Sequence, residues 1–369
     1  MTSATKFLYI DDALSMKKGG VLPSYTLAYE TWGKLNTNRS NAVLILTGLS
    51  PSAHAASSED DPSTGWWEPM IGPGRPIDTN RFYIIGLNSL GSCKGSTGPA
   101  SINPKTGKPY RLNFPDLCVE DIAKTANLLV DHLGIDQLCV MVGPSMGGMS
   151  ALSYLQQNPL GARHFLTISS SPESEPFSIA VRSLQRELIV TDPDWNNGNY
   201  DEQHWPENGM RMARKLGMLS YRSAEEWRVR FGRRVQDYFP TEPFGMNYEV
   251  ESYLEAAARR FIHSFDPCSY LYLSRAMDWF NVADGYPDLP EALTGIELKS
   301  ACVIAVTTDI LFPAHQQKAI ADALSGNGVN TSYTLLDSLM GHDAFLVDYV
   351  VFNPLVAKYF NQVWSEDGL

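Results

Sequence analysis

The chain has 369 residues, of which 44% are hydrophobic and 19% charged, a composition typical of a globular protein. Its net charge of −12 argues against nonspecific binding to nucleic acid or to an anionic membrane, although a local arginine cluster could still bind a small anionic substrate. The five cysteines are scattered and odd in number, which favours free thiols over a disulfide framework or a zinc site. No apolar leader or membrane-length run is recognisable, so we expect a soluble cytoplasmic protein.

The first part of the chain alternates between strand and helix patterns. Residues 1–40 predict an N-terminal β meander, and a long polar loop holding Trp66 and Trp67 separates two later strands. A helix is expected at 121–133, where Gly134 ends it. The apolar runs that predict buried strands are 42–46, 82–87, 138–142 and 164–168. This alternation predicts a mostly parallel α/β sheet.

The pattern changes in residues 173–298, where apolar residues recur at helical spacing. We interpret this segment as a helical insertion covering the sheet, and residues 1–172 and 299–369 as the core. Strands are expected to resume at 301–306 and 331–336. A closing helix is predicted at 354–364, with Asn353 as its cap and Pro354 in its first turn.

Residues 143–147, GPSMG, fit the G-x-S-x-G nucleophile elbow. The motif requires a buried strand before the serine and a helix after it, and both are predicted here. Small residues at Gly143 and Gly147 allow the sharp corner that exposes Ser145, and the following helix directs its N-terminal dipole at developing negative charge. The alternative is a glycine-rich turn whose serine only caps the helix.

A nucleophilic serine needs a base that takes its proton and an acid that orients the base. In sheets with such an elbow, the acid and then the histidine follow the serine along the chain. Asp309 and His342 each follow a predicted strand, at the edge where active sites of open α/β sheets gather. Asp337 is a rival acid. The other candidate histidines are more simply interpreted as ordinary surface or packed residues: His54, His132, His204, His263 and His315.

The oxyanion of an acyl-transfer reaction needs two backbone N–H donors. We expect one from Met146, the residue after the nucleophile, and one from Leu46 or Thr47 at the exit of an earlier strand. The alternative for residues 46–48 is an ordinary strand exit.

Beyond these residues, the chain resembles the homoserine/serine O-acyltransferase family of the α/β-hydrolase superfamily over nearly its whole length. The resemblance is carried by motifs at 46–48 (LTG), 65–67 (GWW), 70–74 (MIGPG), 77–79 (IDT), 88–93 (NSLGSC), 95–99 (GSTGP), 143–149 (GPSMGGM), 270–273 (YLYL) and 341–345 (GHDAF). It implies an α/β-hydrolase fold, a mostly parallel central sheet with an inserted helical lid. It also implies transfer of an acyl group from acyl-CoA to the hydroxyl of a short amino acid through an acyl-serine.

The same resemblance implies that no cofactor or metal is used and that the protein forms a homodimer through its helical lids. By resemblance, Arg186 binds the carboxylate of the amino acid and Asp343 its ammonium group. The simpler alternatives are a solvated lid arginine and a capping aspartate.

The chain departs from the homoserine-acetylating members at two places, of which the first concerns specificity. After residues 46–48 the chain continues Leu49, Ser50, Pro51 toward His54, which resembles the serine O-succinyltransferase branch, and Pro144 replaces a more usual Gly or Asn. Serine is one methylene shorter than homoserine, a difference worth about 1–3 kcal/mol in a pocket. We therefore expect a wall that makes the acceptor site shallower, formed by Gly48, Leu49, Ser50 and Pro51.

The succinyl group differs from acetyl by a carboxylate, which needs a cationic partner in a closed pocket. Arg182 lies four residues before Arg186, so that both face one side of a helix, an unfavourable arrangement unless an anion lies between them. We hypothesise that Arg182 binds the succinyl carboxylate. The alternative pairs Arg182 with Glu175, Glu187 or solvent.

The sequence therefore predicts a ping-pong transfer of succinyl from succinyl-CoA to L-serine, a step of cysteine biosynthesis. Homoserine O-acetyltransferase or O-succinyltransferase, in methionine biosynthesis, is the alternative within this class. A serine ester or thioester hydrolase would use the same triad without a bound amino acid. A non-catalytic binding protein would usually lack part of the triad.

Overall fold

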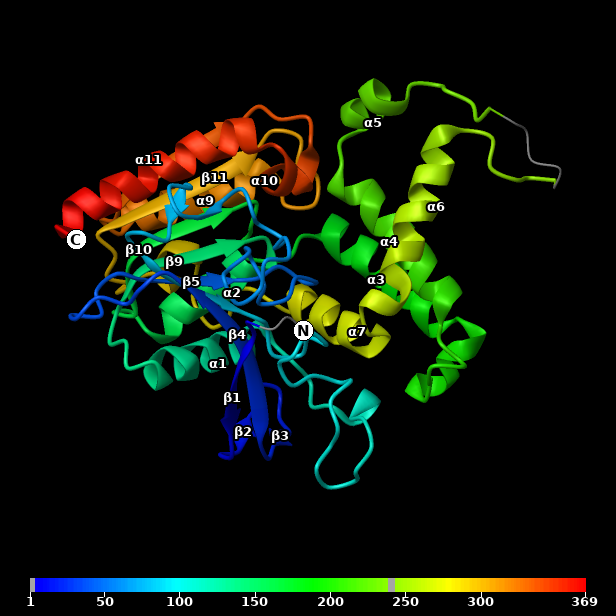
Figure 1. Cartoon of the computed structure of the whole chain (residues 1–369), viewed down its shortest axis with the longest axis horizontal. Helices are drawn as coiled ribbons and strands as arrows, with labels where there is room; N and C mark the ends of the chain where they lie inside the picture. Colours follow the sequence, from blue (N-terminus) through cyan, green and yellow to red (C-terminus); the bar gives the residue numbers. More distant parts are fainter. Residues whose placement is uncertain (1–3, 238–242) are drawn as a thin grey trace.

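The computed structural model describes residues 4–237 and 243–369. A strand-rich core and a group of helices lie side by side, with the helices beyond one end of the core (Figure 1). The C-terminus lies at the side of the core that faces away from these helices. Among the described residues, no helix is both long enough and apolar enough to cross a membrane.

The central sheet has eight strands in the described residues, in the order β1-β4-β8-β5-β9-β10-β11-β12. The pairs β1–β4 and β4–β8 are antiparallel, and all later neighbours are parallel. The strand bounds are β1 (Lys6–Ile10), β4 (Tyr25–Trp32), β5 (Ala42–Leu46), β8 (Tyr83–Leu87), β9 (Leu138–Pro144), β10 (Ala162–Ile168), β11 (Ser300–Val306) and β12 (Asn330–Leu336). Two short ribbons lie outside the sheet: β2 (Leu14–Ser15) with β3 (Val21–Leu22), and β6 (Ile71–Gly72) with β7 (Ile77–Asp78). The predicted mostly parallel α/β sheet is confirmed.

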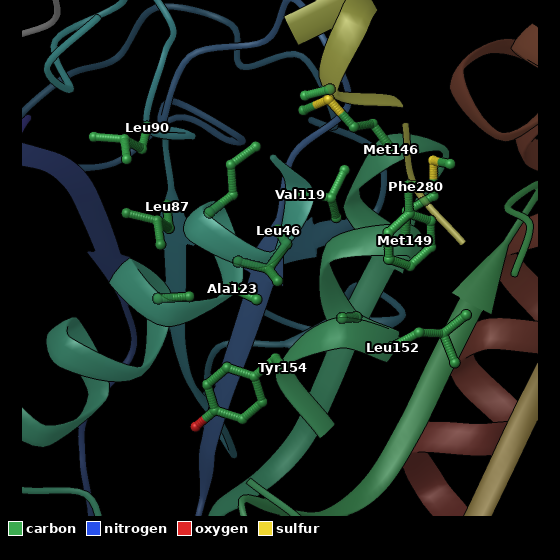
Figure 2. Packing of buried hydrophobic residues seen from close by; sticks show 14 of the residues in the cluster. Leu46, Leu87, Leu90, Val119, Ala123, Met146, Met149, Leu152, Tyr154 and Phe280 are labelled. Atoms are coloured by element: carbon green, nitrogen blue, oxygen red, sulfur yellow. The ribbon is translucent and has the colours of Figure 1, made fainter. Parts of the chain in front are cut away.

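The parallel strands are apolar on both sides, so both faces of the sheet must be covered, and helices cover them. β5 and β9 are buried along their whole length. One face packs against α1 (Val119–His132), α2 (Met146–Gln157) and α9 (Ala314–Gly326). Figure 2 shows Leu46 and Leu87 of the sheet beside side chains of α1 and α2. The other face packs against α11 (Tyr349–Asp367), whose Phe352 and Val356 are fully buried.

The segment between β10 and β11 is helical, as its spacing predicted, although residues 238–242 of the predicted insertion lie outside the described residues. The helices α3 to α7 form the group beside the core in Figure 1, and α8 packs against α9 of the core; the whole segment is called the lid from here on. Their bounds are α3 (Pro176–Val190), η2 (Pro193–Gly198), α4 (Glu207–Tyr221), α5 (Ala224–Phe231), α6 (Glu249–Phe261), η3 (Ile262–Ser264), α7 (Pro267–Asp278) and α8 (Leu289–Ala292). Shorter helical turns occur in the core at η1 (Arg111–Asn113), η4 (Gly341–Asp343) and α10 (Ala344–Val347).

The predicted start of the closing helix is wrong. The helix α11 begins at Tyr349, so Pro354 lies inside it and Asn353 is not its cap. Proline at the sixth position removes the hydrogen bond to the Val350 carbonyl. Val350 is 85% exposed, so water can satisfy that carbonyl, and the helix continues through the proline.

Candidate active site

Ser145 stands at the corner between β9 and α2 in a conformation that side chains rarely adopt. Its φ is 55° and its ψ −130°. The corner depends on glycine, because a Cβ at Gly143 would overlap the backbone of Gly147, and a Cβ at Gly147 would overlap the Leu46 carbonyl oxygen. Strain of this kind persists only where the surrounding structure enforces it. The local geometry is therefore that of a nucleophile elbow.

The structure brings Ser145, His342 and Asp309 into one hydrogen-bonded chain. His342 Nε2 lies 2.9 Å from Ser145 Oγ, and His342 Nδ1 lies 2.8 Å from Asp309 Oδ2. The other carboxylate oxygen, Asp309 Oδ1, accepts hydrogen bonds of 2.9 Å from the N–H groups of Leu311 and Phe312. Two backbone donors thus fix the carboxylate, which in turn orients the imidazole. This is the geometry that lets a histidine remove the serine proton.

Aromatic rings fix His342 from two sides. The Phe312 ring stacks on the imidazole at 4.9 Å between centroids, and Phe345 meets it edge-on at 5.9 Å. Burial by itself lowers the pKa of His342, but the charge and hydrogen bond of Asp309, together with the charge of Asp343, outweigh burial and raise the pKa above its usual value. The imidazolium formed during proton transfer is therefore stabilised where it forms.

The exit of β5 lies against the elbow, where the Leu46 carbonyl oxygen faces Gly147 and Gly48 lies beside Ser145. Gly147 approaches the Leu46 carbonyl so closely that no side chain fits between them. Met146 is the first residue of α2, so its N–H belongs to the free N-terminal turn of that helix. Met146 directly follows Ser145, and the exit of β5 lies beside the elbow. That the N–H groups of Met146 and of Leu46 or Thr47 stabilise an oxyanion remains a prediction.

A cavity of about 190 Å³ opens above Ser145. Core residues Gly48, Leu49, Ser50, Pro51 and Trp66 line one side of it, so the predicted acceptor wall does face the nucleophile. The opposite side comes from the lid and includes Arg182, Gln185, Arg214, Tyr221 and Tyr270. A small molecule bound at Ser145 would therefore contact both core and lid.

The two arginines predicted to share a helix face have different surroundings. Arg182, 3% exposed, lies 2.5 Å from Asp278 Oδ1 through Nε and donates from Nη2 to Ser174. Arg186 lies 2.6 Å from the other oxygen, Asp278 Oδ2, and donates to Ser274. The anion between the two guanidinium groups is thus Asp278, rather than Glu175, Glu187 or solvent, and no substrate is needed to separate the charges.

Arg182 nevertheless keeps one free donor. Its Nη1 is buried without a hydrogen-bond partner among the residues that the structure describes, and Arg182 lines the cavity. A buried donor without a partner costs about 1–3 kcal/mol, which a bound carboxylate would recover.

Comparisons with known proteins agree on one family. A sequence profile of the α/β hydrolase fold matches residues 41–349. Serine O-succinyltransferases from Xanthomonas campestris pv. campestris (strain B100) and Stenotrophomonas maltophilia (strain K279a) are 54% and 53% identical to this chain, each over 97% of both proteins. The chain belongs to the homoserine/serine O-acyltransferases of the α/β-hydrolase superfamily. It is an acyltransferase.

Solved structures of this superfamily superpose over nearly the whole chain. A homoserine O-acetyltransferase from Bacillus anthracis has a TM-score of 0.89 at 28% identity and covers 97% of both chains. Esterase E22 has a TM-score of 0.87 at 27% identity, covering 96% of this chain and 99% of its own. The fold thus holds acyltransferases and hydrolases alike, and the residues around the nucleophile must distinguish them.

In this acyltransferase, Arg214 of α4 lines the cavity, whereas Arg186 is not among the residues that line it. The guanidinium of Arg214 lies over the rings of Phe261 and Tyr221, at 4.6 and 5.6 Å from their centroids. Its Nε is buried without a hydrogen-bond partner within the described part of the chain. Ser274 and Asp278 hold the guanidinium of Arg186, and its predicted role as the carboxylate ligand stays a prediction. Sequence reasoning missed Arg214.

Asp343 lies on the cavity beside His342, as the resemblance implied. One of its oxygens lies 3.2 Å from Arg222 Nε, so this carboxylate already has a cationic neighbour at the end of the lid helix α4. A substrate ammonium would bind the same carboxylate as a second cation.

The rival residues lie elsewhere. Asp337 accepts a hydrogen bond from Thr307 rather than from a histidine. His204 and His263 form exposed ion pairs with Asp201 and Glu207 in the lid, and His315 pairs with Glu175.

Proposed function

We propose that this acyltransferase transfers the succinyl group of succinyl-CoA to the hydroxyl of L-serine, giving O-succinyl-L-serine and CoA. The observation that carries the proposal is the cavity above Ser145. It combines a nucleophile, the wall formed by residues 48–51, and two arginines that each keep a buried donor without a partner among the described residues. The serine O-succinyltransferase names of relatives at 53–54% identity support the choice of donor and acceptor.

In the first half of the reaction, His342 takes the Ser145 proton and Ser145 Oγ attacks the thioester carbonyl carbon. Negative charge forms on the carbonyl oxygen, where the N–H groups of Met146 and Leu46 would stabilise it. The carbon–sulfur bond then breaks, the thiolate of CoA takes the proton from His342, and an ester on Ser145 remains.

In the second half, L-serine takes the place of CoA. Its carboxylate would bind Arg214 and its ammonium Asp343, so that its hydroxyl lies near His342. His342 removes the hydroxyl proton, the serine oxygen attacks the ester carbonyl, and the proton returns to Ser145 as O-succinyl-L-serine leaves. A ping-pong rate law follows from this order.

The choice of donor depends on Arg182. Its free Nη1 would bind the distal carboxylate of the succinyl group, while Asp278 and Ser174 hold the rest of the guanidinium in place. Acetyl has no carboxylate and would leave this donor without a partner.

We further infer a cytoplasmic homodimer that uses acyl-CoA as co-substrate and requires no cofactor or metal. Exposed apolar side chains on two lid helices support lid-to-lid packing: Phe177, Leu184 and Val190 on α3, and Met212 and Leu219 on α4. Light scattering coupled to gel filtration would test the dimer.

A thiol-release assay tests the proposed function. Succinyl-CoA and acetyl-CoA are each combined with L-serine, L-homoserine or no acceptor. We expect fastest CoA release from succinyl-CoA with L-serine. Preference for acetyl-CoA with L-homoserine would contradict both specificity assignments, and equal release without any acceptor would indicate a hydrolase.

A further inference from the structure

The loop that follows β5 supplies two parts of the cavity wall, residues 48–51 and Trp66. Hydrogen bonds tie these parts together, because Trp66 Nε1 donates to the Ser52 carbonyl and Trp66 N to the His54 carbonyl, at 3.1 and 3.2 Å. Asn88 Nδ2 donates to the Pro51 carbonyl at 3.1 Å. The position of the wall therefore depends on what fixes the loop behind it.

His54 lies behind this wall and is 6% exposed. Its Nδ1 lies 2.8 Å from Glu30 Oε2. Glu30 belongs to β4 and is 1% exposed, and its other oxygen accepts a hydrogen bond from Thr5. The pair thus links the loop to the central sheet.

The other ring nitrogen also faces acceptors. Nε2 of His54 lies 2.9 Å from the Ser63 carbonyl and 3.1 Å from Ser63 Oγ, whose own proton goes to Asp61 at 2.6 Å. A neutral imidazole has one N–H donor, whereas an imidazolium has two. Because a carboxylate and a carbonyl oxygen can only accept, an ionised Glu30 and the Ser63 carbonyl together favour the imidazolium.

The charged groups around His54 agree with this protonation state. Glu30 faces it from β4, and Asp61 and Glu68 face it from the loop. Burial alone lowers the pKa of His54, but the hydrogen bonds to Glu30 and Ser63 and the charges of Glu30 and Asp61 raise it overall.

We propose that His54 is a positioning residue, an imidazolium that clamps both arms of the loop to Glu30 and thereby holds the wall against which L-serine binds. The inference rests on the proposed function, since that wall belongs to the serine site. His54 does not line the cavity, so it acts through residues 48–51 and Trp66 and not on the substrate itself.

The clamp predicts a pH dependence with a definite sign. Below the pKa of His54 both hydrogen bonds are present, and above it one is lost. The KM for L-serine should therefore be low at low pH and rise as the pH passes this pKa. Glu30→Gln removes the charge that raises the pKa, so the rise should move to lower pH, whereas a change caused by the ammonium of serine itself would not move.

The test compares His54→Gln with a matched control, His263→Gln, which removes an exposed histidine–glutamate pair of the lid. Glutamine can donate to one of the two acceptors only. We expect His54→Gln to raise the KM for L-serine about tenfold, the effect of one lost charged hydrogen bond, with little change in the rate of Ser145 acylation. His263→Gln should leave both unchanged.

NMR of the wild-type protein at neutral pH supplies a measurement that needs no folded variant, with the His54 resonance assigned through its bonded correlations to the backbone. An imidazolium signal supports the proposal, and a neutral ring overturns it. An unchanged KM in folded His54→Gln also overturns it. Failure of the wild type to transfer any acyl group to L-serine would instead refute the proposed function.

Discussion

The two sides of the cavity differ in what holds them in place. Around Ser145, backbone fixes the geometry: a strained φ, two glycines in contact with neighbouring peptides and two N–H groups on Asp309. On the lid side, contacts between side chains fix the geometry: Asp278 pairs with Arg182, and the ring of Phe261 lies against the guanidinium of Arg214.

The difference indicates that the elbow determines the reaction and that the lid determines the substrate. A lid side chain can be substituted without moving the sheet, so substrate preference can change while the catalytic geometry at Ser145 stays the same. This is why one fold holds transferases and hydrolases. Substitutions of the catalytic triad should therefore abolish turnover for every substrate, and substitutions of the cavity-lining lid arginines should change the preference among substrates.

Ser145→Ala should have the largest effect. Without the nucleophile no acyl-enzyme forms, and kcat should fall by about a millionfold, as in other enzymes of this mechanism. The measurement is CoA release with succinyl-CoA and L-serine. Ser150→Ala, which removes a buried hydroxyl one turn along α2, is the control and should remain active. Substantial turnover by Ser145→Ala would exclude a covalent route.

Asp309→Asn should lower kcat by about 10⁴-fold, because the imidazole loses the carboxylate that orients it. The base must be neutral to accept a proton, so kcat/KM for succinyl-CoA should rise as pH increases through the pKa of His342. Asp309 raises that pKa, so the rise in the variant should begin at lower pH. A pH–rate profile identical to that of the wild type would contradict this coupling.

Arg214→Gln should raise the KM for L-serine by about 10- to 100-fold, the effect of losing a hydrogen-bonded charge partner. Acylation of Ser145 by succinyl-CoA should change much less. Arg211→Gln is the control: it lies on the same helix but pairs with Glu255 outside the cavity. Equal losses in both variants would show a general effect on the lid.

Arg182→Gln should have the smallest effect, about a tenfold loss of succinyl transfer without an equal loss of acetyl transfer. The matched control is Arg186→Gln, since Arg186 pairs with the other oxygen of Asp278 and lies off the cavity. Initial rates with both acyl-CoA donors measure the ratio. If Arg182→Gln lowers both rates equally, its role is structural.

The features that depend on short segments of the chain could be predicted from the sequence. The strand, corner and helix around Ser145 are contiguous, and chain order with strand ends was enough to select Asp309 and His342 over Asp337 and His315. The alternating sheet followed from apolar runs of strand length. These features depend on periodicity and small residues, which are properties of short segments.

The features that could not be predicted depend on packing between segments that are distant in the sequence. Asp278 lies almost a hundred residues after Arg182, so no spacing rule reveals that it separates the two arginines. Arg214 faces the cavity only because of how α4 packs on α3 and α6, and its cation–π contacts leave no sequence signal beyond a helical arginine. The start of α11 was missed because a proline usually marks a first turn, whereas solvent accommodates Pro354 here.

The most direct test is to mix the protein with succinyl-CoA alone, quench it in acid and map the modified peptide by mass spectrometry. The account predicts one succinyl group on Ser145, an equal amount of released CoA, and loss of the adduct when L-serine is added before the quench, with O-succinyl-L-serine formed. CoA release that requires L-serine and leaves no adduct on Ser145 would contradict it.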